Sequence, residues 1–355
     1  MAVVAAASLA TIGGGLAFGA RSDASVERGD PGARLPAGAL AGEYWDLVAR
    51  FESGHLLVAT AALANTGPGG RTAVVLGELV EPGGKVHRFS RSEREGGWRL
   101  EDNGRRLDLQ SIVLDQAGPT RRFVVDKNEL GIDLAIEGAG APAWPARDVS
   151  PGCDFDVLEV AGSATGSFRP GRAAAPVALR GLAALTHRWT PGLEVDCLRR
   201  AVELFAMEPG LGLYFRESET PSGAREAWLL VRRDGRTVFQ GAPSGSELGW
   251  RAGAAGYPDL AWLRFTAPGL AGRAEFGEPL GVFEPFARLP APLRAALELR
   301  TRPRLAWSTP SFELRSGSRS LRGPALAKLA WTNPQPPGGA GVPAAAALEP
   351  GSGGN

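Results

Sequence analysis

The sequence predicts an all-β protein whose antiparallel strands form two consecutive barrels or half-barrels. Its 355 residues include 49 glycines and 28 prolines, which interrupt helices and mark turns. Apolar residues come in short runs, about ten residues apart, with turn residues between them. Antiparallel strands in such numbers close most easily into barrels or sandwiches, because closure removes exposed sheet edges.

The first half is expected between residues 43 and 150. The runs HLLVATAAL (55–63) and RTAVVLGELV (71–80) flank a turn rich in Gly, Asn and Pro, which is typical of a hairpin. Further short runs continue to about residue 137 at the same spacing. The Pro-rich stretch 138–152 contains few β-branched residues and is the best candidate for an internal domain boundary.

The second half, expected at 151–332, repeats this style of short apolar runs and tight turns. Residues 193–205 (LEVDCLRRAVELF) also fit helical spacing, but we predict a strand because the neighbouring runs are strands. Residues 290–299 (PAPLRAALEL) are the exception, since an early proline followed by helically spaced leucines predicts a short helix.

The two ends of the chain differ from this β-rich body. Residues 2–20 form an uncharged run rich in Ala and Gly, similar to the apolar part of a secretory signal but without its basic start. Residues 1–42 are therefore expected to be an apolar leader and linker, through which the protein is exported to the periplasm or contacts a membrane; a disordered tail on a cytoplasmic protein is the alternative. Residues 333–355 are expected to be a disordered tail.

Composition excludes several classes of function. The 39 basic and 38 acidic residues leave a net charge of +1, so a nucleic-acid partner is not expected. Two cysteines and three histidines without metal-ligand spacing predict no metal and no cofactor. Cys153 and Cys197 form either one disulfide or two buried free thiols. The sequence has neither a complete phosphate-binding loop nor a G-x-S-x-G nucleophile motif.

One local pattern suggests a site. His187 and Trp189 stand two residues apart in a predicted strand, which places both side chains on the same face. Tyr214 follows in a later strand, with Arg216 two residues beyond it. The alternative is that His187 and Trp189 are a packed pair in a barrel wall.

This arrangement resembles the lipocalin-like hydroxyneurosporene synthase (carotenoid hydratase) family, whose second barrel carries a D-H-x-W strand and then a Y-x-D strand. Residues 43–46 (EYWD) are similar to the aromatic opening of that family's first barrel. The resemblance covers about residues 43–331 and implies two lipocalin-like (calycin-type) barrels. It implies catalytic roles for His187, Trp189 and Tyr214, with Tyr44 and Trp45 binding the ligand.

The departures from the family pattern decide which chemistry is expected. Hydration of a carotenoid needs an acid that protonates an alkene, but Arg216 stands where the family has the Asp of Y-x-D, and Thr186 replaces the Asp before His187. Because an arginine is always cationic, it does not supply that proton. Arg216 is expected to pair with Glu203 or Glu217, or to bind a carboxylate or phosphate group of a ligand.

These observations predict a protein that binds an apolar isoprenoid, lipid or polyketide-like molecule in a barrel cavity. The first alternative is an enzyme of the carotenoid hydratase kind, a hydro-lyase, or a cyclase that holds its substrate in one conformation and needs no acid. The second alternative is a structural pair of barrels without a ligand.

Overall fold

The computed structural model describes residues 28–36, 38, 40–65, 70–138, 140–145, 153–284, 291–317 and 319–335. The apolar run 2–20 with its expected membrane contact, most of the predicted tail, and residues 146–152 of the predicted boundary lie outside this set. The described residues form three antiparallel sheets and one α-helix, which confirms the all-β prediction. No helix among them is both long and apolar enough to cross a membrane.

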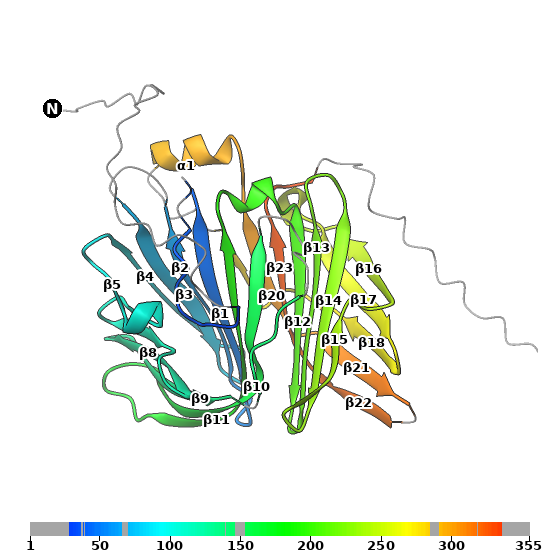
Figure 1. The fold of residues 1–355 in the computed structure, drawn as a ribbon. Helices are drawn as coiled ribbons and strands as arrows, with labels where there is room; N and C mark the ends of the chain where they lie inside the picture. Colours follow the sequence, from blue (N-terminus) through cyan, green and yellow to red (C-terminus); the bar gives the residue numbers. More distant parts are fainter. Residues whose placement is uncertain are drawn as a thin grey trace, which may run out of the picture.

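The first half of the molecule is one antiparallel sheet of eleven strands that curls into a half-barrel (Figure 1). Its spatial order is β4-β3-β2-β1-β11-β10-β9-β8-β7-β6-β5. The strands are β1 (Gly42–Phe51), β2 (Leu56–Ala64), β3 (Thr72–Val80), β4 (Val86–Arg94), β5 (Arg99–Glu101), β6 (Arg106–Asp108), β7 (Ile112–Asp115), β8 (Thr120–Lys127), β9 (Leu130–Glu137), β10 (Asp154–Arg169) and β11 (Val177–Thr190), with a short 3-10 turn η2 (Asp102–Gly104).

The second half consists of a seven-stranded sheet, β15-β14-β13-β12-β23-β20-β19, packed on a five-stranded sheet, β16-β17-β18-β21-β22. The first of these contains β12 (Arg200–Glu208), β13 (Leu211–Glu219), β14 (Arg225–Arg233), β15 (Arg236–Gly241), β19 (Gly281–Phe283), β20 (Arg304–Ser308) and β23 (Leu326–Trp331). The second contains β16 (Gly245–Arg251), β17 (Asp259–Ala267), β18 (Leu270–Glu275), β21 (Ser311–Ser316) and β22 (Arg319–Pro324). The remaining elements are η3 (Glu194–Asp196), η4 (Ala254–Gly256) and α1 (Ala291–Glu298).

The predicted strand at residues 193–205 begins only at residue 200, and residues 194–196 form the 3-10 turn η3. Residues 200–208 form β12, and nearly every one of them is buried because this strand lies between the first sheet and the core of the second half. A strand buried on both faces has a continuous apolar run, which explains its match to helical spacing. The predicted short helix is α1, above the first half in Figure 1.

The boundary between the sheets differs from the predicted domain boundary at residue 150. Strands β10 and β11 pair with β9 and β1, so the first sheet continues to Thr190. The Pro-rich stretch therefore connects two neighbouring strands of one sheet. Proline and glycine mark a change of direction in a chain, and here that change returns the chain to the sheet it has just left.

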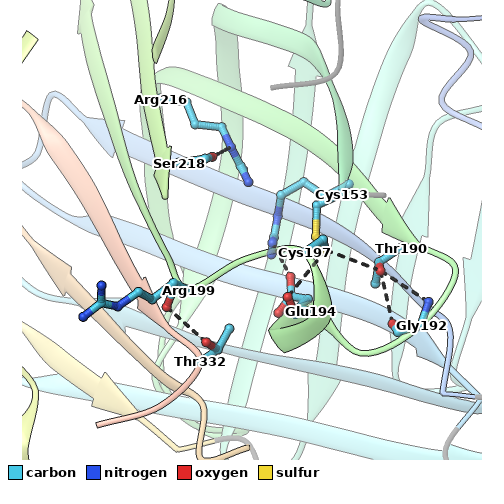
Figure 2. The surroundings of a disulfide bond; sticks show 10 residues. Cys153, Thr190, Gly192, Glu194, Cys197, Arg199, Arg216, Ser218 and Thr332 are labelled. Atoms are coloured by element: carbon cyan, nitrogen blue, oxygen red, sulfur yellow. Dashed lines mark hydrogen bonds and ion pairs between the residues drawn. A yellow bond between two sulfur atoms is a disulfide. The ribbon is translucent and has the colours of Figure 1, made fainter. Parts of the chain in front are cut away.

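A disulfide joins the two halves. Cys153 precedes β10 of the first sheet and Cys197 follows η3, just before β12 of the second half, and their Cα atoms are 5.8 Å apart. Figure 2 shows the bond with Thr190 and Glu194 beside it and Arg216 above it. Of the two sequence alternatives, the structure has the disulfide.

The described residues form three large apolar cores and a fourth, small one around the disulfide. One lies inside the curled first sheet, the second between the seven- and five-stranded sheets, and the third between the halves. The third core includes Val48 of β1, Phe155 of β10 and Tyr214 of β13. Strands β1 and β11 thus have the first core on one face and the second half on the other.

Candidate functional site

The strand pair β1 and β11 separates two polar clusters. The strands are antiparallel neighbours, with Trp45 opposite His187 and Glu43 opposite Trp189. Because successive side chains of a strand point to opposite faces, Glu43 and Trp45 lie on the face that lines the first sheet, and Asp46 lies on the face toward the second half. We call these the inner and the outer face.

The inner face carries a carboxylate, an imidazole and two indoles. Nε2 of His187 lies 2.7 Å from Oε1 of Glu43, and both residues are fully buried. The imidazole stacks on Trp45 with ring centres 4.8 Å apart, and the ring of Trp189 lies 5.2 Å away. In the part of the chain that the structure describes, Nδ1 of His187 has no hydrogen-bond partner.

An irregular segment, residues 28–36, covers this cluster and is called the strap below. The backbone amides of Arg34 and Leu35 donate to the two carboxylate oxygens of Glu43, at 2.6 and 2.9 Å. The indole N–H of Trp45 donates to the carbonyl of Pro31 at 3.2 Å. The guanidinium of Arg34 lies over the ring of Trp189, 3.9 Å from its centre. The strap therefore covers the inner-face cluster and separates it from solvent.

The outer face carries a buried network of ion pairs around Asp46. Its carboxylate accepts hydrogen bonds from Lys328 Nζ at 2.6 Å and Thr60 Oγ1 at 2.6 Å, and its Oδ2 lies 3.1 Å from Arg188 Nε. Burial alone would raise the pKa of Asp46, but the adjacent Lys328 and Arg188 hold that pKa well below its usual range. Asp46 is therefore a carboxylate under ordinary conditions, and Arg188 also pairs with Glu194 at 2.7 Å.

The network continues into the second half through Glu203. Its Oε1 accepts from Arg216 at 2.5 Å and from the Tyr214 hydroxyl at 3.0 Å, and its Oε2 lies 3.7 Å from Lys328 Nζ. Burial acts to raise the pKa of Glu203, yet Lys328 and Arg216 lower it overall. Burial and the charge of Glu203 raise the pKa of Tyr214 well above its usual range, so this phenol keeps its proton.

The structure divides the six residues singled out from the sequence between the two faces. His187, Trp189 and Trp45 lie together on the inner face. Tyr214 and Arg216 belong to the outer network, where Arg216 pairs with Glu203 rather than with Glu217. The expected group of His187, Trp189 and Tyr214 is thus not assembled, because a strand pair lies between its members.

Tyr44 also points to the outer face, where the guanidinium of Arg188 lies 5.0 Å from the centre of its ring. At the end of the strand pair, Tyr44, Trp189 and Arg216 border one small cavity of about 10 Å³ beside Cys153. A space of this size holds about one water molecule. It is too small for a ligand of the expected kind.

A larger cleft lies between the halves, and sequence reasoning missed it. It has a volume of about 230 Å³ and is bordered by β2, β3 and β4 on one side and by β19 and β20 on the other. Its residues are distant in sequence and belong to different sheets, so no local pattern indicated them. The side chains that line it include apolar and aromatic ones, Val58, Leu76, Val282, Phe283 and Trp307, and three polar ones, Thr60, Glu78 and Arg88.

The wall of the cleft formed by Thr60 and Trp307 contacts the buried ion pairs of the outer face. Thr60 borders the cleft and donates its hydroxyl hydrogen to Asp46, and the Nζ atom of Lys328 lies 5.7 Å from the ring centre of Trp307. At the opening, Glu78 pairs with Arg88 at 2.8 Å. The cleft therefore combines apolar walls with a few fixed polar groups, which is the usual composition of a small-molecule site.

Metal ligands are not grouped in the described ranges, where no set of three or more His, Cys, Asp or Glu side chains is arranged to hold an ion.

The sequence matches no family model and no curated protein. Solved structures with the same fold include the following three. An AttH-like protein from Nitrosomonas europaea is 12% identical with a TM-score of 0.60, over 82% of this chain and 92% of that one. CghA, solved with Sch210972, is 12% identical with a TM-score of 0.61, over 87% and 96%. Kievitone hydratase from Nectria haematococca is 9% identical with a TM-score of 0.56, over 84% and 91%.

This similarity confirms the lipocalin-like two-half fold that the sequence motifs indicated. At these identities it establishes the fold, and the chemistry must be argued from the residues of this chain.

Proposed function

We propose that the protein is an enzyme of the hydratase or cyclase type that holds an apolar small molecule, of the isoprenoid or polyketide class, in the cleft between its halves. The observation that carries this proposal is the cleft itself, with its aromatic wall of Phe283 and Trp307 and its polar inner contact through Thr60. Proteins with the same fold include one named a hydratase, which supports an enzyme more than a plain binding protein.

The size of the cleft limits which part of a substrate it encloses. Small-molecule sites commonly measure about 300–1,000 Å³. At about 230 Å³ the cleft encloses one ring or one branched end of a substrate, and the rest extends past Glu78 and Arg88. A polar group at that outer end would meet the Arg88 guanidinium.

The charges around the cleft favour one reaction class over the other. Hydration of an isolated alkene needs a protonated acid, but Asp46 and Glu203 are held as carboxylates by their cationic neighbours. Glu78 pairs with Arg88. A cyclisation that proceeds when the substrate is held in a folded conformation needs no acid, so it fits this cleft better.

A plain binding protein is the second candidate, because the same cleft would bind an apolar molecule without converting it. The test is to extract the purified protein with organic solvent and identify the bound molecules by mass spectrometry. We expect a reproducible apolar compound. If the protein is an enzyme, the compound and its isomer or hydrate should interconvert when the protein is added back; if it is a carrier, it should return unchanged.

The location of the site is tested with a matched pair of variants. Trp307→Ala removes an aromatic wall of the cleft, and Trp262→Ala removes an indole from the five-stranded sheet of the second half. Trp307→Ala should lower the amount of extracted compound at least tenfold, whereas Trp262→Ala should leave it unchanged. Equal retention by both variants contradicts the cleft as the site, and a reproducibly empty wild-type protein favours a structural pair of barrels.

We also propose that the protein is exported. Disulfides persist mainly in oxidising compartments, and Cys153–Cys197 is such a bond. Thiol labelling of the protein immediately after cell lysis should find both cysteines protected. The labelling is done in denaturant without reductant, so that buried free thiols would also react. Complete labelling of both cysteines would contradict export.

A further inference from the structure

The inner face of the β1–β11 pair has the features of a second binding site that the chain itself occupies. We propose that the strap, residues 28–36, is an internal ligand of this site. When the strap lifts, the site binds a planar, apolar organic molecule that carries a cationic group. The site lies on the opposite face of the strand pair from the cleft, so it is independent of the proposed function.

The charges of the site require a cation. Glu43, Asp154 and Asp156 contribute three carboxylates, and Asp156 is fully buried. Arg34 Nη2 lies 3.0 Å from Asp156, and Arg28 lies 2.8 Å from Asp154 and 3.3 Å from Asp156. Because buried carboxylates need compensating charge, lifting the strap would leave this site acidic and ready for another cation.

The aromatic walls of the site specify the shape of the ligand. The guanidinium carbon of Arg34 lies 3.9 Å from the ring centre of Trp189, and that of Arg28 lies 5.2 Å from the same centre. The Trp45 indole N–H bonds the strap carbonyl of Pro31. A planar cation would reproduce both the contact with the indole face and the hydrogen bond to the Asp156 carboxylate.

His187 supplies a second, independent indication of a ligand. Its side chain is fully buried between two indoles, and its Nδ1 has no partner within the described ranges. Most buried polar atoms of folded proteins have a hydrogen-bond partner, so each one without a partner calls for an explanation. A bound molecule with an additional N–H or O–H group would satisfy it.

The strap is attached to the first half mainly by polar contacts. It belongs to none of the three sheets, and most of its attachments to the first half are hydrogen bonds and ion pairs to side chains. Of its apolar side chains, Ala33 and Leu35 reach the first core and are only partly buried. Leu35 has a φ of 50°, a left-handed conformation that a branched residue rarely adopts. Segments with little apolar burial open at lower free energy than core strands.

The test uses benzamidine, a planar aromatic amidinium, and full-length variants, with binding measured by isothermal titration calorimetry. Arg34→Ala removes the guanidinium from Trp189 and should bind benzamidine at least tenfold more tightly than wild type. Arg34→Lys, which keeps a cation in place, should remain close to wild type. Arg122→Ala removes an arginine from a partly exposed pair with Asp133 and serves as the control. The proposal is overturned if Arg34→Ala and Arg122→Ala bind benzamidine equally.

Two further measurements locate the site and cover a variant that fails to fold. Adding Asp156→Asn to Arg34→Ala should return the affinity to the wild-type level; an unchanged tight affinity overturns the proposal. In folded wild-type protein, diethyl pyrocarbonate should modify His187 faster than global unfolding occurs, and benzamidine should slow that modification. Modification of His187 only at the rate of global unfolding overturns it as well.

Discussion

The two faces of the β1–β11 strand pair carry similar chemical groups, which are shielded from solvent in different ways. On the outer face, Asp46 is enclosed by strands of both halves, and its cation Lys328 comes from β23 at the far end of the chain. On the inner face, Glu43 is enclosed by the strap, an irregular segment. The outer cluster is thus enclosed by the sheets of both halves, whereas the inner cluster is covered by the strap, which can separate from the first sheet.

Burial alone therefore does not identify a functional site. Both carboxylates are fully buried and both are paired. The two carboxylates differ in the free energy needed to expose them. Exposing Asp46 requires separation of the two halves, whereas exposing Glu43 requires only that the strap lifts. The expected sizes of the following effects depend on that distinction.

The largest effect should come from Asp46→Ala. This change leaves Lys328 and Arg188 buried without their shared carboxylate, and breaking a buried pair in this way typically costs about 3–5 kcal/mol. Urea denaturation should show that loss. Asp133→Ala, which breaks an exposed pair with Arg122, should change the free energy of unfolding by less than about 1 kcal/mol. Equal effects of the two variants would mean that the outer network does not lock the halves.

Removal of the disulfide should have the second-largest effect on stability. It closes a long loop and connects the first sheet to the strand that begins the second half. Replacing both Cys153 and Cys197 with Ser should lower the free energy of unfolding by about 2–4 kcal/mol. Wild-type protein treated with a reducing agent should show a similar loss. A double variant as stable as the oxidised wild type would show that the network alone joins the halves.

Glu43→Ala should have a smaller effect than Asp46→Ala. It removes the acceptor for His187 and for two strap amides, but the strap can shift and let water reach these donors. We expect a loss of about 1–3 kcal/mol in the same denaturation assay. Glu43→Gln keeps one acceptor oxygen and should lose less. A loss from Glu43→Ala that matches that of Asp46→Ala would remove the distinction between the faces.

The pH dependence should show the smallest effect. Asp46 has a lowered pKa in the folded protein, so its contribution is complete above its unfolded value near 3.8 and is lost as pH falls toward the folded value. Between pH 4 and pH 3, stability should fall by about 1 kcal/mol from this group. Asp46→Asn should have a shallower acid slope in denaturation experiments at several pH values. An unchanged slope would show that Asp46 does not titrate with a lowered pKa.

Local patterns predicted those parts of the fold and site that depend on neighbours in sequence. The period of two placed His187 and Trp189 on one face, and the structure has them there with ring centres 5.2 Å apart. The partner of Arg216 could also have been found, because the Pro209-Gly210 turn sets a hairpin register in which Glu203 lies opposite Arg216.

Contacts between distant segments left no such signal. Glu43 and His187 are 144 positions apart, and Asp46 and Lys328 are 282 apart. Tyr214 was grouped with His187 because of a family motif, and only the packing of the halves reveals that a strand pair separates them. The same reason explains the missed cleft, whose walls come from two sheets.

Amide hydrogen exchange of the folded protein, measured at increasing subdenaturing urea, tests the difference between the two faces most directly. The strap amides of Gly29, Arg34 and Leu35 donate to Asp156 and Glu43, and they should exchange through a local opening that is insensitive to urea. The amides of β1 and β12 should exchange only by global unfolding, with the full dependence on urea. If the strap and these strands exchange with the same rates and the same urea dependence, the inner face is as firmly closed as the outer one and the strap does not open separately.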